Sequence, residues 1–343
     1  PDLLRQHLAW SIAQGWAGPA KTIYFGGGTP SLLTPQAIAG ILQEIAQRFG
    51  IAPDAEITLE ANPGTVTLES LTGYRAAGIN RLSLGLQTLE SKQLKQLGRL
   101  HSRQDGLEAC HQARQAGFKN LSLDLMFALP GQTLPELQQE IEAYLALNPE
   151  HLSCYGLTAE PGTPFETAVE TGHLTLPDDE AYAEAFLLVD EQLTRSGYQH
   201  YEIANYARDG FACQHNLGYW QRRPYLGLGA GAHSFNAQNW GSRLAVPADL
   251  GLFQQALSNR KDPTQLLEQF DRDGALSETI YLLLRTRSGA CDSELQKHFG
   301  VSLAEAFPQA VEQLSKWLVH SEDRWAFTPA GWLLFDRLIQ AFL

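Results

Sequence analysis

Polar residues and glycines recur at the points where successive β-rich segments of the chain end. Three glycines close the first such segment, and carboxylate, amide and hydroxyl side chains close the later ones. In chain order these groups are residues 26–29, Glu60, Gln87, Asp124, and Thr158 with Glu160. Carboxylate and amide oxygens accept hydrogen bonds from ammonium and hydroxyl groups, and bare glycine backbone leaves room for a ligand. If the segment ends meet at one edge, we expect a pocket for a ligand that carries an ammonium group and a ribose.

The glycine run in IYFGGGTP, residues 23–30, has three interpretations. A phosphate cradle would need a Lys or a helix start rich in N–H donors, but the run has no Lys and Pro30 removes a donor. A tight turn and a backbone edge cleared for another ligand both stay open. The other strand-end groups also have ordinary interpretations as turns or helix caps. Their joint occurrence in chain order favours a site.

Short β-rich runs alternate with longer amphipathic runs through the first 205 residues. The expected strands cover 21–26, 56–60, 80–85, 120–125, 151–156 and 200–204. The expected helices cover 35–49, 67–77, 90–97, 103–117, 134–147 and 178–196. Strict alternation predicts parallel strands with crossover helices. Because no G-x-G-x-x-G follows the first strand while polar groups follow strand after strand, a (β/α) barrel is favoured, and an open doubly wound sheet is the alternative.

The chain divides into three expected parts, which are an α/β region at 1–205, an aromatic connecting segment at 206–250 and a smaller, mostly α domain at 251–343. Residues 2–14 form an expected helix with no strand before it. Either the natural protein has more sequence upstream, or this homologue lost it.

The last part resembles a winged-helix module in the order of its elements. Expected helices lie near 274–286, 291–299 and 303–319, followed by a β-like segment at 320–328 and a helix at 328–342. Its segment 288–300 supplies only Lys297 and His298 as cations. Packing or contact with a partner is therefore favoured over DNA binding.

The composition excludes several classes of protein. A net charge of -13 argues against general affinity for nucleic acid or anionic lipid, and 44% hydrophobic with 18% charged residues favours a folded core. The four cysteines have no pair at metal-ligand or redox-motif spacing, which favours reduced thiols. With no run of 18 apolar residues and no signal-peptide pattern, we expect a cytoplasmic protein.

Several motifs together carry a family resemblance. YFGGGTPSLL, LEANPG, NRLSLGLQ, LGRLHS, LDLMFALPGQT and YGLTAEPGTPF occur in this order. In this the chain closely resembles the radical S-adenosylmethionine (SAM) proteins of the oxygen-independent coproporphyrinogen III oxidase group. HNLGYW at 215–220 and YLGLGAGAHS at 225–234 look more like the haem-chaperone branch of that group. The resemblance covers residues 21–236, with the remainder matching more loosely.

The resemblance implies an α/β fold built on a partial (β/α)6 TIM-type barrel, here lacking its first strand, with SAM across the strand ends. It implies that Gly27, Gly28 and Thr29 face the methionine amino group. It also implies that the methionine carboxylate and amine or the ribose are held by Glu60, Gln87, Arg99 and Asp124. The chemistry agrees in kind, because a guanidinium clamps a carboxylate through two parallel hydrogen bonds.

One family motif has no counterpart in this sequence. The family begins with C-x-x-x-C-x-x-C, three thiolates that hold a [4Fe–4S] cluster. Cys110 lies in a helical pattern and Cys154 in a strand, so neither replaces closely spaced ligands. The motif would fall before residue 1, which favours a shortened chain over a degenerate family member. As given, the chain is expected to perform no radical chemistry, and the full-length parent is expected to carry the cluster.

HNLGYW combines an imidazole able to ligate iron with aromatic rings able to cover a porphyrin face. On spacing alone, a histidine bonded to a neighbouring carbonyl beside a small aromatic core is equally consistent. The family resemblance favours a haem site with His215 as the axial ligand, and His233 and Cys213 are the alternatives.

Three functions follow from these interpretations. The leading one is a protein that binds haem and delivers it to a haem-requiring acceptor protein. The rival is an oxidase that decarboxylates the propionates of coproporphyrinogen III to vinyls. The third is a non-catalytic regulator that binds a partner through its winged-helix-like tail. We expect a haem or porphyrin ligand and no nucleic acid, and the sequence leaves a homodimer open.

Overall fold

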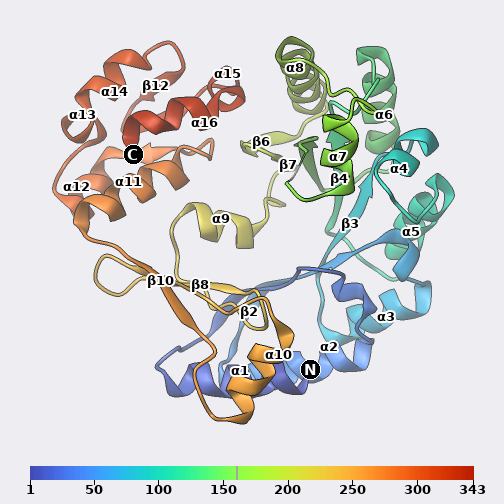
Figure 1. The fold of residues 1–343 in the computed structure, drawn as a ribbon, viewed down its shortest axis with the longest axis vertical. Coiled ribbons are helices and arrows are strands. Elements are labelled where there is room, and N and C mark those ends of the chain that lie inside the picture. The colour runs from blue at the N-terminus through green and yellow to red at the C-terminus, as the bar shows by residue number, and fades with distance from the viewer. Residues whose placement is uncertain (160) are drawn as a thin grey trace. The chain divides into compact units, whose positions relative to one another are not determined.

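The computed structural model describes residues 1–159 and 161–343, and these form two compact units (Figure 1). The barrel unit comprises Tyr24–Pro35 and Ile57–Ala212. The C-terminal unit comprises Pro1–Ile23, Gln36–Glu56 and Cys213–Leu343. Each unit is described by itself below.

A seven-stranded sheet runs in the order β1-β2-β3-β4-β5-β7-β6. Its strands are β1 (Ala20–Phe25), β2 (Ile51–Ala61), β3 (Arg81–Gln87), β4 (Leu121–Phe127), β5 (His151–Gly156), β6 (Gln199–Glu202) and β7 (Asn205–Ala207). The pairs β2–β3, β3–β4 and β4–β5 are parallel, as the alternating pattern predicts. The order follows the chain through β5 with no reversal, whereas a doubly wound sheet reverses at a switch point. The sheet therefore agrees with the expected barrel type.

The prediction of a single parallel strand at 200–204 is wrong. The structure has a hairpin there, in which β6 and β7 pair antiparallel and β7 pairs antiparallel with β5. A two-residue turn at 203–204 reverses the chain, and such short connections join antiparallel strands only. The alternation therefore ends at β5.

Most helices agree with the sequence expectation to within a few residues. Those between the strands are α2 (Pro35–Arg48), α3 (Leu68–Ala77), α4 (Ser91–Gln96), α5 (Arg103–Gln115), α6 (Leu134–Ala146) and α8 (Asp179–Arg195), and they follow α1 (Asp2–Ala13). A short α7 (Pro164–Glu170) was not expected. Thr67, Ser102 and Thr133 each begin a helix with a capping box. Gly78 adopts the left-handed conformation that ends α3.

The C-terminal unit contains more regular structure after residue 206 than expected. It has α9 (Gln214–Trp220), β8 (His233–Asn236), β9 (Ser242–Ala245), α10 (Leu250–Ser258) and β10 (Gln265–Gln269), with a three-stranded sheet in the order β10-β9-β8. Next come α11 (Arg272–Leu283), β11 (Ala290–Cys291), α12 (Asp292–Phe299), α13 (Leu303–Ala306), α14 (Pro308–Gln313), β12 (Leu318–Ser321), β13 (Arg324–Phe327), α15 (Pro329–Leu333) and α16 (Phe335–Leu338). The expected helix at 303–319 breaks at Pro308, which begins α14.

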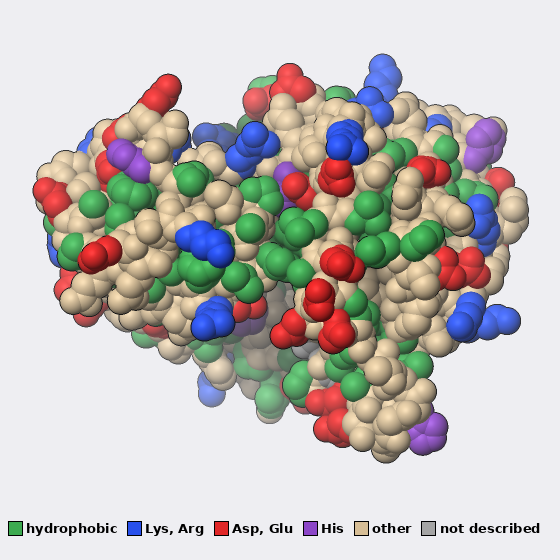
Figure 2. Space-filling view, turned by 90° about the horizontal axis from the view of Figure 1, so that it is seen from above, with side chains coloured by type: hydrophobic (Ala, Val, Ile, Leu, Met, Phe, Trp, Pro, Cys, Tyr) green, Lys and Arg blue, Asp and Glu red, His purple; other side chains and the backbone are tan. Residues whose placement is uncertain are grey.

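The central strands are largely buried, with leucines on one face and polar residues or glycine on the other. All seven residues of β3 are buried, which is typical of a parallel strand with helices over its sheet. On the surface that Figure 2 shows, Lys and Arg side chains are scattered among Asp and Glu. Among the described residues, no helix is both long and apolar enough to cross a membrane.

Candidate functional site

Three of the expected site residues lie close together in the barrel unit: Glu60 near the end of β2, Gln87 at the end of β3 and Asp124 in the middle of β4, which runs two residues further than expected. In the parallel register Glu60 pairs with Ser83, and Ser83 Oγ donates a hydrogen bond of 3.4 Å to Asp124 Oδ1. Tyr24 Oη donates to Glu60 Oε1 at 2.7 Å. A Cβ atom on Gly85 would lie 3.2 Å from Gln87 Nε2 and 3.8 Å from Asp124 Oδ2. Carboxylate and amide groups of neighbouring parallel strands thus converge.

Asp124 is the most perturbed carboxyl of this group. Burial and then repulsion from Glu60 raise its pKa to about 7. Arg81, the Ser83 hydroxyl and Arg99 oppose this rise but do not cancel it. The positive charge near Asp124 and Glu60 therefore does not balance the two carboxylates. An ammonium group of a ligand would supply the missing charge.

Arg99 follows α4 and is partly buried. Burial lowers the pKa of its guanidinium, and the charge of Asp124 acts in the opposite direction. The guanidinium of Arg99 is therefore close enough to Asp124 for the two charges to interact. A guanidinium there supplies the donor fork that a ligand carboxylate requires.

The glycine run forms an open backbone edge. A Cβ on Gly26 would lie 2.8 Å from the Tyr24 ring and 3.3 Å from Glu60 Cδ, so packing requires glycine at that position. Gly27 and Gly28 have φ angles of +77° and +59°, with no atom within 4 Å of an added Cβ. Thr29 Oγ1 accepts a hydrogen bond of 3.4 Å from Asn62 Nδ2. The run is therefore both a turn and an exposed set of backbone groups, which is the cradle that a ligand amino group would need.

Gln87 ends β3 in the left-handed conformation, with φ 66°. This conformation costs free energy for a residue other than glycine, and such residues cluster at functional sites. Glu140 from α6 accepts hydrogen bonds from Thr88 Oγ1 at 3.0 Å and from Leu89 N at 2.5 Å. The buried carboxylate thus anchors the turn that directly follows Gln87.

Two expected site residues follow β5. Thr158 is exposed. Glu160 lies outside the described residues.

The cysteines do not fit an iron–sulfur cluster. All four are free and buried: Cys110 in α5, Cys154 in β5, Cys213 before α9 and Cys291 in β11. Across 1–159 and 161–343, no group of three His, Cys, Asp or Glu side chains could hold a metal ion. The described residues therefore do not fit a cluster held by three thiolates.

A second candidate site lies on α9 in the C-terminal unit. Its N-cap residue, Cys213, makes no side-chain cap. Glu56 from β2 replaces the cap, because its carboxylate accepts from Gln214 N and from His215 N, each at 3.1 Å. An anion at a helix N-terminus satisfies free N–H groups and complements the helix dipole. Sequence inspection missed Glu56, since its position in the middle of a strand gives no signal.

His215 lies between two hydroxyl groups. Its Nδ1 and Thr22 Oγ1 are 2.9 Å apart, and its Nε2 and Tyr219 Oη are 2.8 Å apart. The Tyr219 ring meets the imidazole edge-on at 4.7 Å and also meets Tyr225 at 4.5 Å. Burial raises the pKa of Tyr219 to about 12, so its hydroxyl stays protonated at neutral pH.

The two alternatives to His215 differ from it in exposure. Cys213 is buried, and its Sγ lies 3.5 Å from Glu56 Oε1. His233 is exposed at the start of β8.

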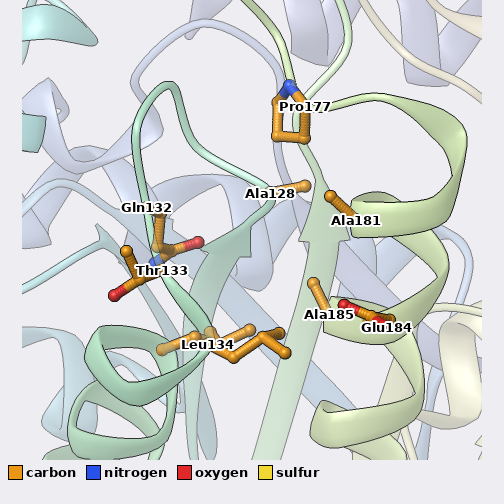
Figure 3. A pocket seen from close by; sticks show the side chains of 9 residues that line it. Ala128, Gln132, Thr133, Leu134, Pro177, Ala181, Glu184 and Ala185 are labelled. Carbon is orange, nitrogen blue, oxygen red and sulfur yellow. The ribbon is translucent and has the colours of Figure 1, made fainter.

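The barrel unit also contains a cavity of about 190 Å³ between the starts of α6 and α8 (Figure 3). Ala128, Ala181 and Ala185 form much of its wall, with Gln132 and Glu184 on opposite sides. None of the sequence-predicted site residues lines it. It is therefore separate from the strand-end groups.

Comparison with known proteins decides the family. Residues 9–143 match the radical SAM superfamily, and residues 270–334 match the HemN C-terminal domain. The heme chaperone HemW of Bacillus subtilis is 35% identical over 345 residues, which cover 100% of this chain and 90% of that protein. The chain belongs to the HemW family. The Escherichia coli HemW is also 35% identical, over 97% of this chain and 86% of its own length.

Membership of the HemW family confirms the sequence resemblance, including its chaperone branch. A solved structure, the coproporphyrinogen III oxidase HemN from Escherichia coli, described as a radical SAM enzyme, matches with a TM-score of 0.83. The match covers 99% of this chain and 82% of HemN, at 22% identity. This likeness shows the fold and confirms the partial barrel with a helical C-terminal region.

Proposed function

We propose that this chain binds haem at α9 and transfers it to a haem-requiring acceptor protein. The strongest support is the position of His215 in the HNLGYW segment of a HemW family member. Its two ring nitrogens lie within hydrogen-bond distance of the Thr22 and Tyr219 hydroxyl groups. The relatives are named heme chaperones, and the proposal extends that activity to this chain.

The contacts of His215 suit an axial ligand. In the tautomer that carries its proton on Nδ1, the imidazole donates to Thr22 Oγ1 and accepts from the Tyr219 hydroxyl at Nε2. The Nε2 lone pair is the one that iron would take, so Tyr219 must release it when haem binds. Thr22 then holds the ring, as partners of metal-bound histidines generally do. Without haem, the Tyr219 hydroxyl therefore occupies Nε2 of His215, the nitrogen that would bind iron.

We also propose that the strand-end groups of the barrel unit bind SAM. Arg99 would bind the methionine carboxylate, and Glu60 with Asp124 would bind the ammonium group or ribose hydroxyls. Gln87 and the backbone at Gly27, Gly28 and Thr29 would complete the cradle. In the radical SAM superfamily SAM supplies a radical when an iron–sulfur cluster reduces it. The described residues do not fit that cluster, so SAM would be held here as a bound ligand.

A second candidate function is oxidation of coproporphyrinogen III, which the likeness of the fold to HemN favours. Both functions require a tetrapyrrole site. Only the oxidase converts propionates to vinyls.

Haem titration followed by absorbance tests the leading proposal. We expect a stoichiometric Soret shift for the unaltered chain and a weaker, shifted spectrum for His215→Ala. His233→Ala is the control and should bind like the unaltered chain, since its side chain is exposed. Haem binding that is indifferent to residue 215 would remove the ligand assignment. Vinyl product from anaerobic incubation of coproporphyrinogen III and SAM with a cluster-bearing form of the protein would move it to the oxidases.

A further inference from the structure

His101 is a buried histidine of the LGRLHS segment, and neither proposed site gives it a role. It directly precedes Ser102, the N-cap residue of α5, and is 8% exposed. Two residues before it, Arg99 is partly buried, whereas Leu100 between them is fully exposed. Arg99 and His101 are therefore both directed toward the protein, from a segment whose middle residue faces solvent.

The imidazole of His101 contacts the end of β3. Its Nε2 lies 3.3 Å from Leu86 O. Because a carbonyl oxygen only accepts hydrogen bonds, Nε2 carries the proton and donates the bond. Burial lowers the pKa of His101, the charge of Arg99 acts in the same direction, and the bond to Leu86 opposes both without cancelling them. At neutral pH the ring is therefore uncharged, with its one proton directed at Leu86 O.

A tight turn fixes the carbonyl that receives this hydrogen bond. Leu86 O also accepts from Thr88 N at 2.8 Å, which closes a γ-turn around Gln87, whose φ is 66°. A γ-turn with positive φ is rare and strained, so it persists only where neighbouring groups hold it. Glu140 holds the far side of the turn, because it accepts hydrogen bonds from Thr88 Oγ1 and Leu89 N. The carbonyl of Leu86 is therefore a fixed point at the end of β3.

His101 attaches the segment that carries Arg99 to this fixed point. The helix that follows His101, α5, packs beside β3 (Figure 1). A Cβ on Gly64, in the turn Pro63–Thr65 after β2, would lie 3.8 Å from His101 Cβ. The charge of Arg99 acts on His101, and the charge of Asp124 acts on Arg99. The imidazole therefore connects the Arg99 segment to the ends of β2 and β3.

We propose that His101 is a positioning residue that holds Arg99 in place for the methionine carboxylate of SAM, an inference that rests on the proposed SAM-binding function. The side chain acts through its bond to Leu86 and does not itself contact the ligand. Groups that bind one ligand must be held to within about 0.5 Å, and hydrogen bonds from residues behind them provide this precision. Arg99 alone, on a segment between two helices, would lack it.

The experiment compares SAM with decarboxylated SAM, which lacks only the methionine carboxylate, by isothermal titration. His101→Phe keeps a planar ring without the donor, and we expect it to lower SAM affinity about tenfold and to change the affinity for decarboxylated SAM less than about threefold. Arg99→Gln should show the same difference between the two ligands more strongly.

Two further variants serve as the rescue and the control. His101→Gln offers an amide N–H at about the reach of Nε2, and should restore SAM affinity to within about threefold of the unaltered chain. His111→Phe makes the same replacement at an exposed histidine of α5, and should change neither affinity.

Each remaining outcome has a definite meaning. Unchanged SAM affinity in His101→Phe, or failure of His101→Gln to restore it, would overturn the role of the hydrogen bond. Equal losses for both ligands, with a fall in melting temperature, would show that His101 only stabilises the fold. If the unaltered chain binds neither ligand, the proposed SAM function itself fails. If it binds both equally well, the assignment of Arg99 to the carboxylate fails, and the inference fails with it.

Discussion

Tyr24 Oη donates a 2.7 Å hydrogen bond to Glu60 Oε1, and so ties the glycine run to the end of β2. Gly26 has no room for a side chain because these two residues occupy its space. The carboxylate of Glu60 is thus oriented before any ligand arrives. Preorganisation of this kind improves affinity by reducing what must be ordered on binding.

Replacement of Tyr24 by Phe tests this orientation. We expect Tyr24→Phe to lower SAM affinity about 3–10-fold, because loss of one hydrogen bond to a charged group is worth about 1 kcal/mol or somewhat more. Isothermal titration with SAM measures the change. Tyr198→Phe is the control, since Tyr198 Oη also donates a hydrogen bond, to Pro149 O, within the barrel unit. Equal losses of affinity in both variants would contradict a specific role for Tyr24.

Asp124 should make stability depend on pH. Its pKa is raised from 3.8 to about 7, so between these values the folded chain holds a proton that the unfolded chain has lost. The free energy of unfolding should therefore fall as pH rises from about 4 to about 7. Asp124→Asn should remove this dependence and be about 1–3 kcal/mol more stable than the unaltered chain at about pH 8. Urea denaturation at several pH values measures it. A variant that is less stable throughout this range would contradict the assigned shift.

An added methyl group at Gly85 should crowd two neighbouring side-chain amides. A Cβ there would lie 3.2 Å from Gln87 Nε2 and 3.3 Å from Asn62 Oδ1. We expect Gly85→Ala to displace these amides and reduce SAM affinity about tenfold, with a stability loss of about 1–3 kcal/mol from overpacking. Gly64→Ala is the matched control, because its nearest contact would be an ordinary 3.8 Å. Unchanged SAM binding by Gly85→Ala would show that the amides take no part in the site.

Glu56 should control the order of α9. Glu56→Ala removes the acceptor for Gln214 N and His215 N, and should destabilise the C-terminal unit by about 1–2 kcal/mol. Haem affinity should fall several-fold, because the backbone that carries His215 loses its anchor. Glu56→Gln keeps an acceptor oxygen and should lose less than half as much. Identical behaviour of Ala and Gln would point to charge rather than capping.

Tyr219 and Thr22 should affect haem binding in opposite directions. Tyr219→Phe removes the hydroxyl that occupies His215 Nε2, so haem should bind more tightly or faster. Thr22→Val removes the acceptor for Nδ1–H and should weaken binding, since such partners commonly contribute 10–100-fold in metal affinity. Stopped-flow absorbance measures both. Weaker binding by Tyr219→Phe would show that the hydroxyl supports haem rather than competes with it.

Regular elements could be predicted from the sequence because their signals are local. The strands and most helices follow from alternation and from glycines such as Gly78 that end a helix. The hairpin at β6 and β7 could not, since its direction depends on pairing with β5 rather than on residue pattern. The division at 205 and 250 stays a prediction.

The proximity of three expected site residues could be predicted from the sequence. Glu60, Gln87 and Asp124 come together because they lie on three parallel strands that neighbour one another in the sheet, and their role in binding a ligand stays a prediction. Glu56 and Thr22 were missed because their partners are more than 150 residues away in the chain.

The burial of the four thiols has a consequence for a carrier of iron porphyrin. Free haem reacts with oxygen and peroxide, and exposed thiolates are the side chains that such oxidants attack first. Burial raises the pKa of Cys110 to about 12 and raises that of Cys154 further, so both remain unreactive thiols. With haem bound as proposed, Cys110 and Cys154 would therefore be poor targets for oxidants formed at the ligand.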